Sequence, residues 1–261
     1  MYDRRRILPL AIACAAALIG AAAVFGLAYY FFIAEDVSPG RPLAAASTLA
    51  GGGSEIGEPF GVAVRGRDVF VSDGTGGKIW RISTDERPAE YAHGLNTPSA
   101  IAFDKDGSLI VADTGSHTVR KIAADGVVTI IAGADGQPGD ADGPALSARF
   151  NAPVGVSVLP DGAIAIADTY NDKIKVIRNG SVTTLAGSTR GRADGGAGEA
   201  RFDTPCGITP WADGSILVAD TGNALVRRVS SAGVVTTLAG GGNAEFGDGT
   251  LLSSRFSRPY A

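Results

Sequence analysis

Three carboxylates in this chain recur at a fixed distance before a Phe and could bind a cation or a polar ligand. Each of these Asp residues is followed by Gly and lies eight residues before the Phe; they are Asp142, Asp194 and Asp248. An Arg directly precedes each Phe, at Arg149, Arg201 and Arg255. One hypothesis is that these side chains surround a central opening and bind a ligand there. The regular repetition favours the alternative, in which each Asp caps its own turn, each Arg pairs locally and each Phe packs between repeats.

These residues belong to a sequence unit that occurs four times. Every copy starts at a Pro and ends its second apolar run with an Asp; these residues are Asp73, Asp113, Asp168 and Asp220. A repeat of this kind indicates one supersecondary unit used several times. We therefore interpret the four Asp residues as structural residues of a turn, each accepting hydrogen bonds from backbone N–H groups of that turn. Chemistry is expected where the units differ.

Each unit shows the pattern of four antiparallel strands. In the fourth copy a turn at Asp213-Gly214 precedes an unbroken apolar run at 215–219, which is typical of a strand buried on both faces. Further strands are predicted at 225–229 and 235–238. Four antiparallel strands per repeat are typical of a propeller blade. The sequence therefore predicts an all-β fold, a β-propeller of four-stranded blades.

Several motifs recur in one order with nearly constant gaps, among them VADTGN at 218–223, Leu-Ala-Gly at 238–240 and Ala-Arg-Phe at 200–202. On these motifs the chain resembles the NHL-repeat β-propeller family over residues 47 to 261. Unit 1 departs from the pattern, because Ser72-Asp73-Gly74-Thr75 replaces Ala-Asp-Thr-Gly. The resemblance implies the fold but little about activity, since such propellers bind proteins or nucleic acids, act as sensors and, more rarely, catalyse reactions.

Both ends of the repeat region contain partial copies of a unit. Ser47–Gly51 copies the fourth strand of a blade, and Pro259-Tyr260-Ala261 copies the opening of another unit. Four complete blades are expected, with the ring left incomplete. The sequence is then a fragment, or the gene is truncated, or another chain completes the ring; the first two are favoured.

A long apolar segment near the N-terminus predicts a membrane anchor. Residues 7–33 contain no charged residue and are long enough to cross a hydrocarbon core of about 30 Å. Because Arg4–Arg6 precede this segment, the positive-inside rule places the N-terminus in the cytoplasm. The predicted order is a cytoplasmic tail (1–6), a single transmembrane helix acting as a signal anchor (7–33), a linker (34–46) and an extracytoplasmic propeller (47–261), in the inner or plasma membrane. The alternative is a cleaved signal peptide, although its apolar region is normally shorter.

Charge and composition exclude several classes of function. Since Asp3 and Arg4–Arg6 contribute +2 to the formal charge of −4, the remainder carries −6, which argues against a nucleic-acid partner. The chain has two His residues, His93 and His117, at non-equivalent positions, so a His-rich zinc site is not supported. Cys206 is interpreted as a small buried residue. We predict no catalytic residue and no cofactor.

Two functions remain after these exclusions. The favoured one is a membrane-anchored binding or scaffold module that recognises a protein or a small polar ligand. The other is a lactonase- or esterase-like hydrolase with carboxylates around a central Ca²⁺, for which oxygen ligands without His suffice. Such an enzyme needs non-repeating acids that converge on the axis, whereas the acids here mostly repeat.

Overall fold

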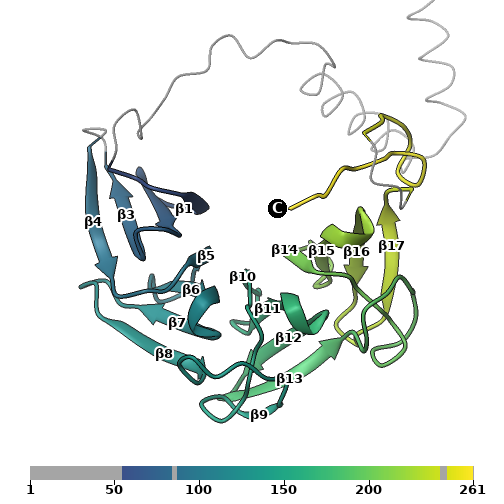
Figure 1. Cartoon of the computed structure of the whole chain (residues 1–261), viewed down its shortest axis with the longest axis horizontal. Coiled ribbons are helices and arrows are strands. Elements are labelled where there is room, and N and C mark those ends of the chain that lie inside the picture. The colour runs from purple at the N-terminus through teal and green to yellow at the C-terminus, as the bar shows by residue number, and fades with distance from the viewer. Residues whose placement is uncertain (1–54, 84–86, 242–245, 261) are drawn as a thin grey trace, which may run out of the picture. The chain divides into compact units, whose positions relative to one another are not determined.

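The computed structural model describes residues 55–83, 87–241 and 246–260, all within one compact unit, Leu49–Ala261. These residues form four antiparallel sheets that stand side by side, each with its first strand toward a common centre (Figure 1). The prediction of four propeller blades is therefore confirmed. The predicted transmembrane helix, the linker and the partial strand Ser47–Gly51 lie outside the described residues. Within the described part of the chain, no helix is both long and apolar enough to cross a membrane.

Four strands in chain order build each blade. Blade 1 contains β1 (Pro59–Arg65), β2 (Asp68–Asp73), β3 (Lys78–Ile82) and β4 (Pro88–His93). Blade 2 contains β5 (Pro98–Phe103), β6 (Leu109–Asp113), β7 (Thr118–Ile122) and β8 (Val128–Gly133). Blade 3 contains β10 (Gly155–Val158), β11 (Ile164–Asp168), β12 (Lys173–Arg178) and β13 (Ser181–Ala186). Blade 4 contains β14 (Pro205–Pro210), β15 (Ile216–Asp220), β16 (Leu225–Val229) and β17 (Val235–Ala239).

The linker between blades 2 and 3 adds a fifth strand to blade 3. This strand, β9 (Gly143–Pro144), pairs with the outermost strand β13. The linker between blades 3 and 4 follows the same course, since Gly195 exchanges backbone hydrogen bonds with Val235 of β17. Each long linker therefore first touches the outer edge of the next blade and then returns to its innermost strand.

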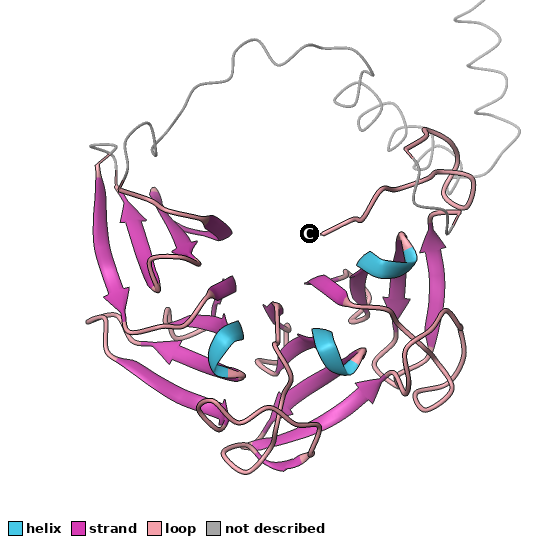
Figure 2. Ribbon diagram, viewed as in Figure 1, coloured by secondary structure: helices cyan, strands magenta, loops and turns pink. Residues whose placement is uncertain are grey.

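A single turn of 3₁₀ helix joins the second and third strands in blades 2 to 4 (Figure 2). These helices are η1 (Thr114–Ser116), η2 (Thr169–Asn171) and η3 (Thr221–Asn223). Each is followed by a residue in the left-handed conformation; the three residues are His117, Asp172 and Ala224, with φ of 57°, 55° and 56°. The turn of blade 1 contains no helix and ends at Gly77, with φ of 61°.

The blades pack on one another through their inner strands and through buried aromatic residues. Gly155 of β10 lies so close to β14 that a Cβ atom would be 2.0 Å from the carbonyl oxygen of Cys206. This close approach explains why a Gly stands two residues after Pro153. The rings of Phe150 and Phe202 are wholly buried. Phe150 lies in the core between blades 2 and 3, and Phe202 in the core between blades 3 and 4. This confirms the prediction that these two Phe residues pack between blades.

Candidate functional site

The Asp that ends the second strand of each blade is buried and holds the linker that leads into its own blade. Asp168 Oδ1 accepts a hydrogen bond of 2.7 Å from Asn151 N, and its Oδ2 accepts one of 2.8 Å from Asn171 Nδ2. Asp113 and Asp220 likewise accept a backbone N–H from the residue 17 positions earlier. For these three carboxylates the prediction of backbone donors from the same turn was wrong. The N–H groups of the turn donate to other acceptors. His117 N, for example, donates to the carbonyl oxygen of Thr114.

A buried cation on the third strand contacts this Asp in blades 3 and 4. Lys175 Nζ lies 3.5 Å from Asp168 Oδ2, and Arg227 Nη1 donates to Asp220 Oδ2 at 2.8 Å. Burial raises the pKa of Asp168 to about 6, although its hydrogen bonds and Lys175 act in the opposite direction. The four side chains are buried, and each pair joins the second and third strands of its blade.

The linker carboxylates Asp142 and Asp194 reach the outermost strand of the next blade. Asp142 Oδ2 accepts a hydrogen bond of 2.7 Å from Thr184 N, and Asp194 Oδ2 accepts one of 3.0 Å from Thr237 N. Asp248 accepts no hydrogen bond from the residues that the structure describes. Asp142 and Asp194 therefore lie at the outermost strands of blades 3 and 4, and not around a central opening.

The three Arg residues before the Phe close the linker loops on themselves. Their backbone N–H groups donate to carbonyl oxygens within the same linker, over distances of 2.8–3.0 Å, from Arg149 to Ala141, from Arg201 to Ala193 and from Arg255 to Gly247. The guanidinium of Arg149 donates to the carbonyl oxygens of Ser147 and Ala148. None of the three Arg side chains lines the cavity between the inner strands.

The cavity between the inner strands has a volume of about 340 Å³ and a mainly apolar lining that includes Phe60, Ile101 and Ile208. The ring of Tyr260 meets that of Phe60 edge to face, with centroids 5.2 Å apart. None of the described carboxylates lines this cavity. Across residues 55–83, 87–241 and 246–260, no group of three or more His, Cys, Asp or Glu residues could hold a metal ion. The described residues therefore supply no ligand set for the central Ca²⁺ of the hydrolase hypothesis.

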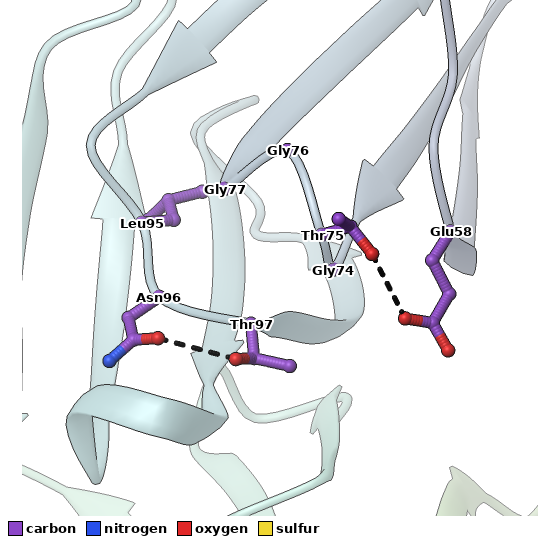
Figure 3. Close-up of a pocket in the computed structure, with 8 residues that line it drawn as sticks. All are labelled: Glu58, Gly74, Thr75, Gly76, Gly77, Leu95, Asn96 and Thr97. Atoms are coloured by element: carbon purple, nitrogen blue, oxygen red, sulfur yellow. Dashed lines mark hydrogen bonds between the residues drawn. The ribbon is translucent and has the colours of Figure 1, made fainter. Parts of the chain in front are cut away.

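A polar pocket of about 410 Å³ lies between blades 1 and 2, where the linker is short (Figure 3). It is lined by Glu58, Gly74, Thr75, Gly76, Gly77, Leu95, Asn96 and Thr97. Asp73 fixes the backbone around this blade 1–2 pocket. Its carboxylate accepts hydrogen bonds from Gly57 N, Glu58 N, Gly76 N and Trp80 Nε1. Burial raises the pKa of Asp73, but these four bonds outweigh it and hold the pKa well below its usual range.

The blade 1–2 pocket exists because unit 1 lacks a side chain that the next two units have. In blade 2, His117 Nδ1 accepts a hydrogen bond of 2.9 Å from Ala152 N, and in blade 3, Asp172 Oδ1 accepts one of 2.8 Å from Thr204 N. The equivalent residues at the blade 1–2 junction are Gly77 and Thr97. Gly77 has no side chain, and Thr97 N has no hydrogen-bond partner among the described residues.

A second bridge between neighbouring blades is missing at the same place. Thr114 Oγ1 donates to Pro153 O at 2.7 Å, and Thr169 Oγ1 donates to Pro205 O at 2.8 Å. Gly74 occupies the equivalent position in blade 1 and cannot donate through a side chain. The two glycines thus leave open a space that side chains fill in blades 2 and 3.

Comparisons with known proteins agree with the repeat pattern. The family model described as NHL repeat matches residues 95–122. NHL repeat-containing protein 2 from Bos taurus is 34% identical over 163 residues, which cover 55% of this chain and 22% of that protein. These matches show an NHL repeat at residues 95–122 and support an NHL-repeat family for the chain. It spans less than a quarter of the length of the curated relatives that it matches first.

Solved structures similar to this NHL-repeat chain include both binding proteins and enzymes. An auxiliary nutrient binding protein from Bacteroides ovatus aligns with a TM-score of 0.62 at 18% identity, covering 80% of this chain and 54% of that one. Virginiamycin B lyase from Staphylococcus aureus aligns with a TM-score of 0.54 at 17% identity, covering 76% and 58%. At these identities the likeness shows the propeller fold alone.

The residues of the blade 1–2 pocket differ from every site residue that the sequence predicted for this NHL-repeat chain. Glu58 Oε2 accepts a hydrogen bond of 3.1 Å from Thr75 Oγ1, and Asn96 Oδ1 accepts one of 3.2 Å from Thr97 Oγ1 (Figure 3). Glu58 is the one charged residue among the described residues of the lining. The sequence did contain one signal for this pocket. Unit 1 departs from the repeat pattern at Ser72–Thr75, and among the four blades it alone lacks the 3₁₀ helix. The pocket therefore presents hydrogen-bond donors and acceptors around a floor of glycines.

Proposed function

We propose that this NHL-repeat chain is a membrane-anchored binding module whose propeller lies outside the cytoplasm and binds a small polar ligand in the blade 1–2 pocket. The observation that carries the proposal is the N–H of Thr97. Its equivalents before blades 3 and 4, the N–H groups of Ala152 and Thr204, donate to His117 and Asp172. Gly77 leaves the N–H of Thr97 without a partner among the described residues. A backbone donor left open in a concave polar site is available to a ligand.

The pocket also favours a small ligand over a protein partner, the other kind of ligand expected from the sequence. Its lining is concave and polar, and Leu95 is the one large apolar residue among the described residues that form it. Protein interfaces are instead centred on buried aromatic and apolar anchors. The membrane anchor and the orientation are supported by the uncharged segment 7–33 and by Arg4–Arg6 before it.

A substitution that fills the pocket tests the binding function. A Cβ on Gly74 would meet only ordinary contacts, the nearest 3.6 Å away, so Gly74→Leu should fold and extend its side chain into the pocket. The matched control is Gly198→Leu, because Gly198 lies in the linker between blades 3 and 4 with open space around its Cβ position. The full chain in detergent is titrated with sugars, amino acids, nucleosides and small carboxylic acids, and the melting temperature is recorded.

At least one of these classes should raise the melting temperature of the wild type and of Gly198→Leu, because a ligand that binds the folded state stabilises it. The same compound should have no effect on Gly74→Leu. An equal rise in Gly74→Leu, or no rise with any class, would overturn the proposed site.

The orientation is tested separately with reporters fused after Ala261. A reporter that is active only outside the cytoplasm should be active, and the protein should remain in the membrane fraction. A soluble form that begins between residues 34 and 46 would show instead that the apolar segment is a cleaved signal.

A further inference from the structure

We propose that the ligand of the blade 1–2 pocket is a neutral carbohydrate, bound through adjacent hydroxyl groups. This inference rests on the proposed binding function and adds the chemical class of the ligand. It follows from two polar groups of the pocket. One is a hydrogen-bond donor, the free N–H of Thr97, and the other is an acceptor, the carboxylate of Glu58.

The N–H of Thr97 requires a hydrogen-bond acceptor, and the neighbouring blades show two solutions. Blade 2 supplies a ring nitrogen, His117 Nδ1, and blade 3 supplies a carboxylate, Asp172. In blade 3 that carboxylate is accompanied by a cation, since Arg190 Nε lies 3.3 Å from Asp172 Oδ2. Among the residues that the structure describes, no Lys or Arg lines the blade 1–2 pocket. An anionic ligand would therefore lack a counter-charge and would face the carboxylate of Glu58, which favours a neutral acceptor.

The carboxylate of Glu58 requires a donor from the ligand. Its Oε2 already accepts from Thr75 Oγ1, and the structure shows no hydrogen bond to Oε1 from the described residues. An ammonium group could pair with Glu58, but it cannot accept from Thr97 N. A hydroxyl group both donates and accepts. A ligand with several hydroxyl groups can thus satisfy both sides of the pocket at once.

The side chains of Glu58 and Thr97 both border the space beside Gly74. A Cβ built on Gly74 would lie 3.7 Å from Thr97 Cγ2 and 3.8 Å from Glu58 Oε2. Neighbouring hydroxyl groups of one sugar ring fit two partners that border a single small space. Because Gly74, Gly76 and Gly77 have no side chains, a ring can approach the backbone closely.

The size of the pocket is consistent with a sugar. Its volume of about 410 Å³ lies within the range of roughly 300–1,000 Å³ usual for small-molecule sites. Asp73 holds the backbone of Glu58 and Gly76 through hydrogen bonds of 3.1 and 2.9 Å, so the wall is formed before any ligand arrives. Asp73 is in this respect a positioning residue.

The experiment is calorimetric titration of the full chain in detergent with two sets of probes. One set holds neutral sugars (glucose, galactose, N-acetylglucosamine, maltose and cellobiose), and the other holds glycine, alanine, succinate and inorganic phosphate. At least one neutral sugar should bind the wild type, and the second set should not. Glu58→Ala should weaken sugar binding by about tenfold or more, because it removes a hydrogen bond to a charged acceptor. Gly74→Leu should abolish binding, and Gly198→Leu should leave it unchanged.

The possible failures separate the two proposals. If an amino acid or an anion binds the wild type and is lost in Gly74→Leu, the pocket is a binding site but the carbohydrate assignment is wrong. If a sugar binds equally well to the wild type, Glu58→Ala and Gly74→Leu, the sugar site lies elsewhere and both proposals fail. If no probe of either set binds, the carbohydrate assignment is overturned. Binding of nucleosides in the broader titration would then still support the pocket.

Discussion

Nη1 of Arg227 donates a hydrogen bond of 2.8 Å to Oδ2 of Asp220, and neither side chain exposes any surface to solvent. Nη2 of the same guanidinium donates at 2.6 Å to Oδ1 of Asp194 in the linker. Arg227 therefore joins the Asp that ends the second strand of blade 4 to the linker Asp before that blade. Lys175 occupies the same place in blade 3, between Asp168 and Asp142.

We predict that Arg227→Met lowers the free energy of unfolding by about 3–5 kcal/mol, since it leaves the carboxylate of Asp220 buried without its cation. The measurement is urea unfolding followed by circular dichroism. Arg228→Met is the matched control, because Arg228 is the next residue on β16 and pairs with Asp213, both side chains being 44% exposed. Its cost should stay below about 1 kcal/mol. Equal losses in the two variants would contradict the assignment of a structural role to the buried pair.

The raised pKa of Asp168 predicts a pH dependence with a definite sign. Burial raises this pKa from 3.8 to about 6, so between these values the folded state binds a proton that the unfolded state has released. The contribution of Asp168 to the free energy of unfolding is therefore largest below about pH 4 and falls as the pH rises through 6. Asp168→Asn should remove this dependence and keep the acceptor for Asn151 N. The free energy of unfolding of the wild type minus that of the variant should fall between pH 4 and 7. A constant or rising difference would show that the folded state does not raise this pKa.

The blades could be predicted from the sequence because their determinants are local. The turn residues Asp106-Gly107 and Asp213-Gly214, and the apolar run that follows each pair, lie within a single unit. The same signals repeat in several units, which makes the period unmistakable. The left-handed residue after each 3₁₀ helix is also local. It is of a different type in each blade (His117, Asp172 and Ala224), so the sequence shows no common pattern there.

The course of the linkers and the position of the pocket could not be predicted, because both depend on contacts between distant residues. Asp142 meets Thr184, which lies 42 positions later on the outermost strand, whereas the sequence suggested a local turn. The pocket depends on a missing side chain at Gly77 and on the N–H of Thr97, which belongs to the next unit. A glycine in a turn is common. That Gly77 leaves the N–H of Thr97 unpaired can be seen only from the packing of blade 2 against blade 1.

The linker carboxylates should contribute to stability in proportion to the bonds they make. Asp142 accepts hydrogen bonds from Thr184 N and Thr184 Oγ1, so Asp142→Ala should lower the free energy of unfolding by about 1–2 kcal/mol. Asp248 accepts none from the described residues, and Asp248→Ala should change it by no more than about 0.5 kcal/mol. Chemical denaturation of both variants gives the comparison. If Asp142→Ala leaves the free energy of unfolding unchanged, the linker is held in place without this carboxylate.

The last prediction concerns the acceptor at the junction of blades 2 and 3. His117 Nδ1 accepts from the N–H of Ala152, which is buried, so His117→Ala should cost about 1–3 kcal/mol of the free energy of unfolding. Backbone strain should not add to this cost, because Ala224 adopts the same left-handed conformation in blade 4.

His117→Asp provides the matched test, since Asp172 accepts from the equivalent N–H in blade 3. This variant should retain most of the wild-type stability, and hydrogen exchange should show the amide of Ala152 protected in His117→Asp and exposed in His117→Ala. Equal destabilisation, with the amide protected in both variants, would mean that Ala152 N has another acceptor. The reasoning that derives the blade 1–2 pocket from Gly77 would then lose its basis, because it assumes that this side chain alone satisfies the N–H of the next blade.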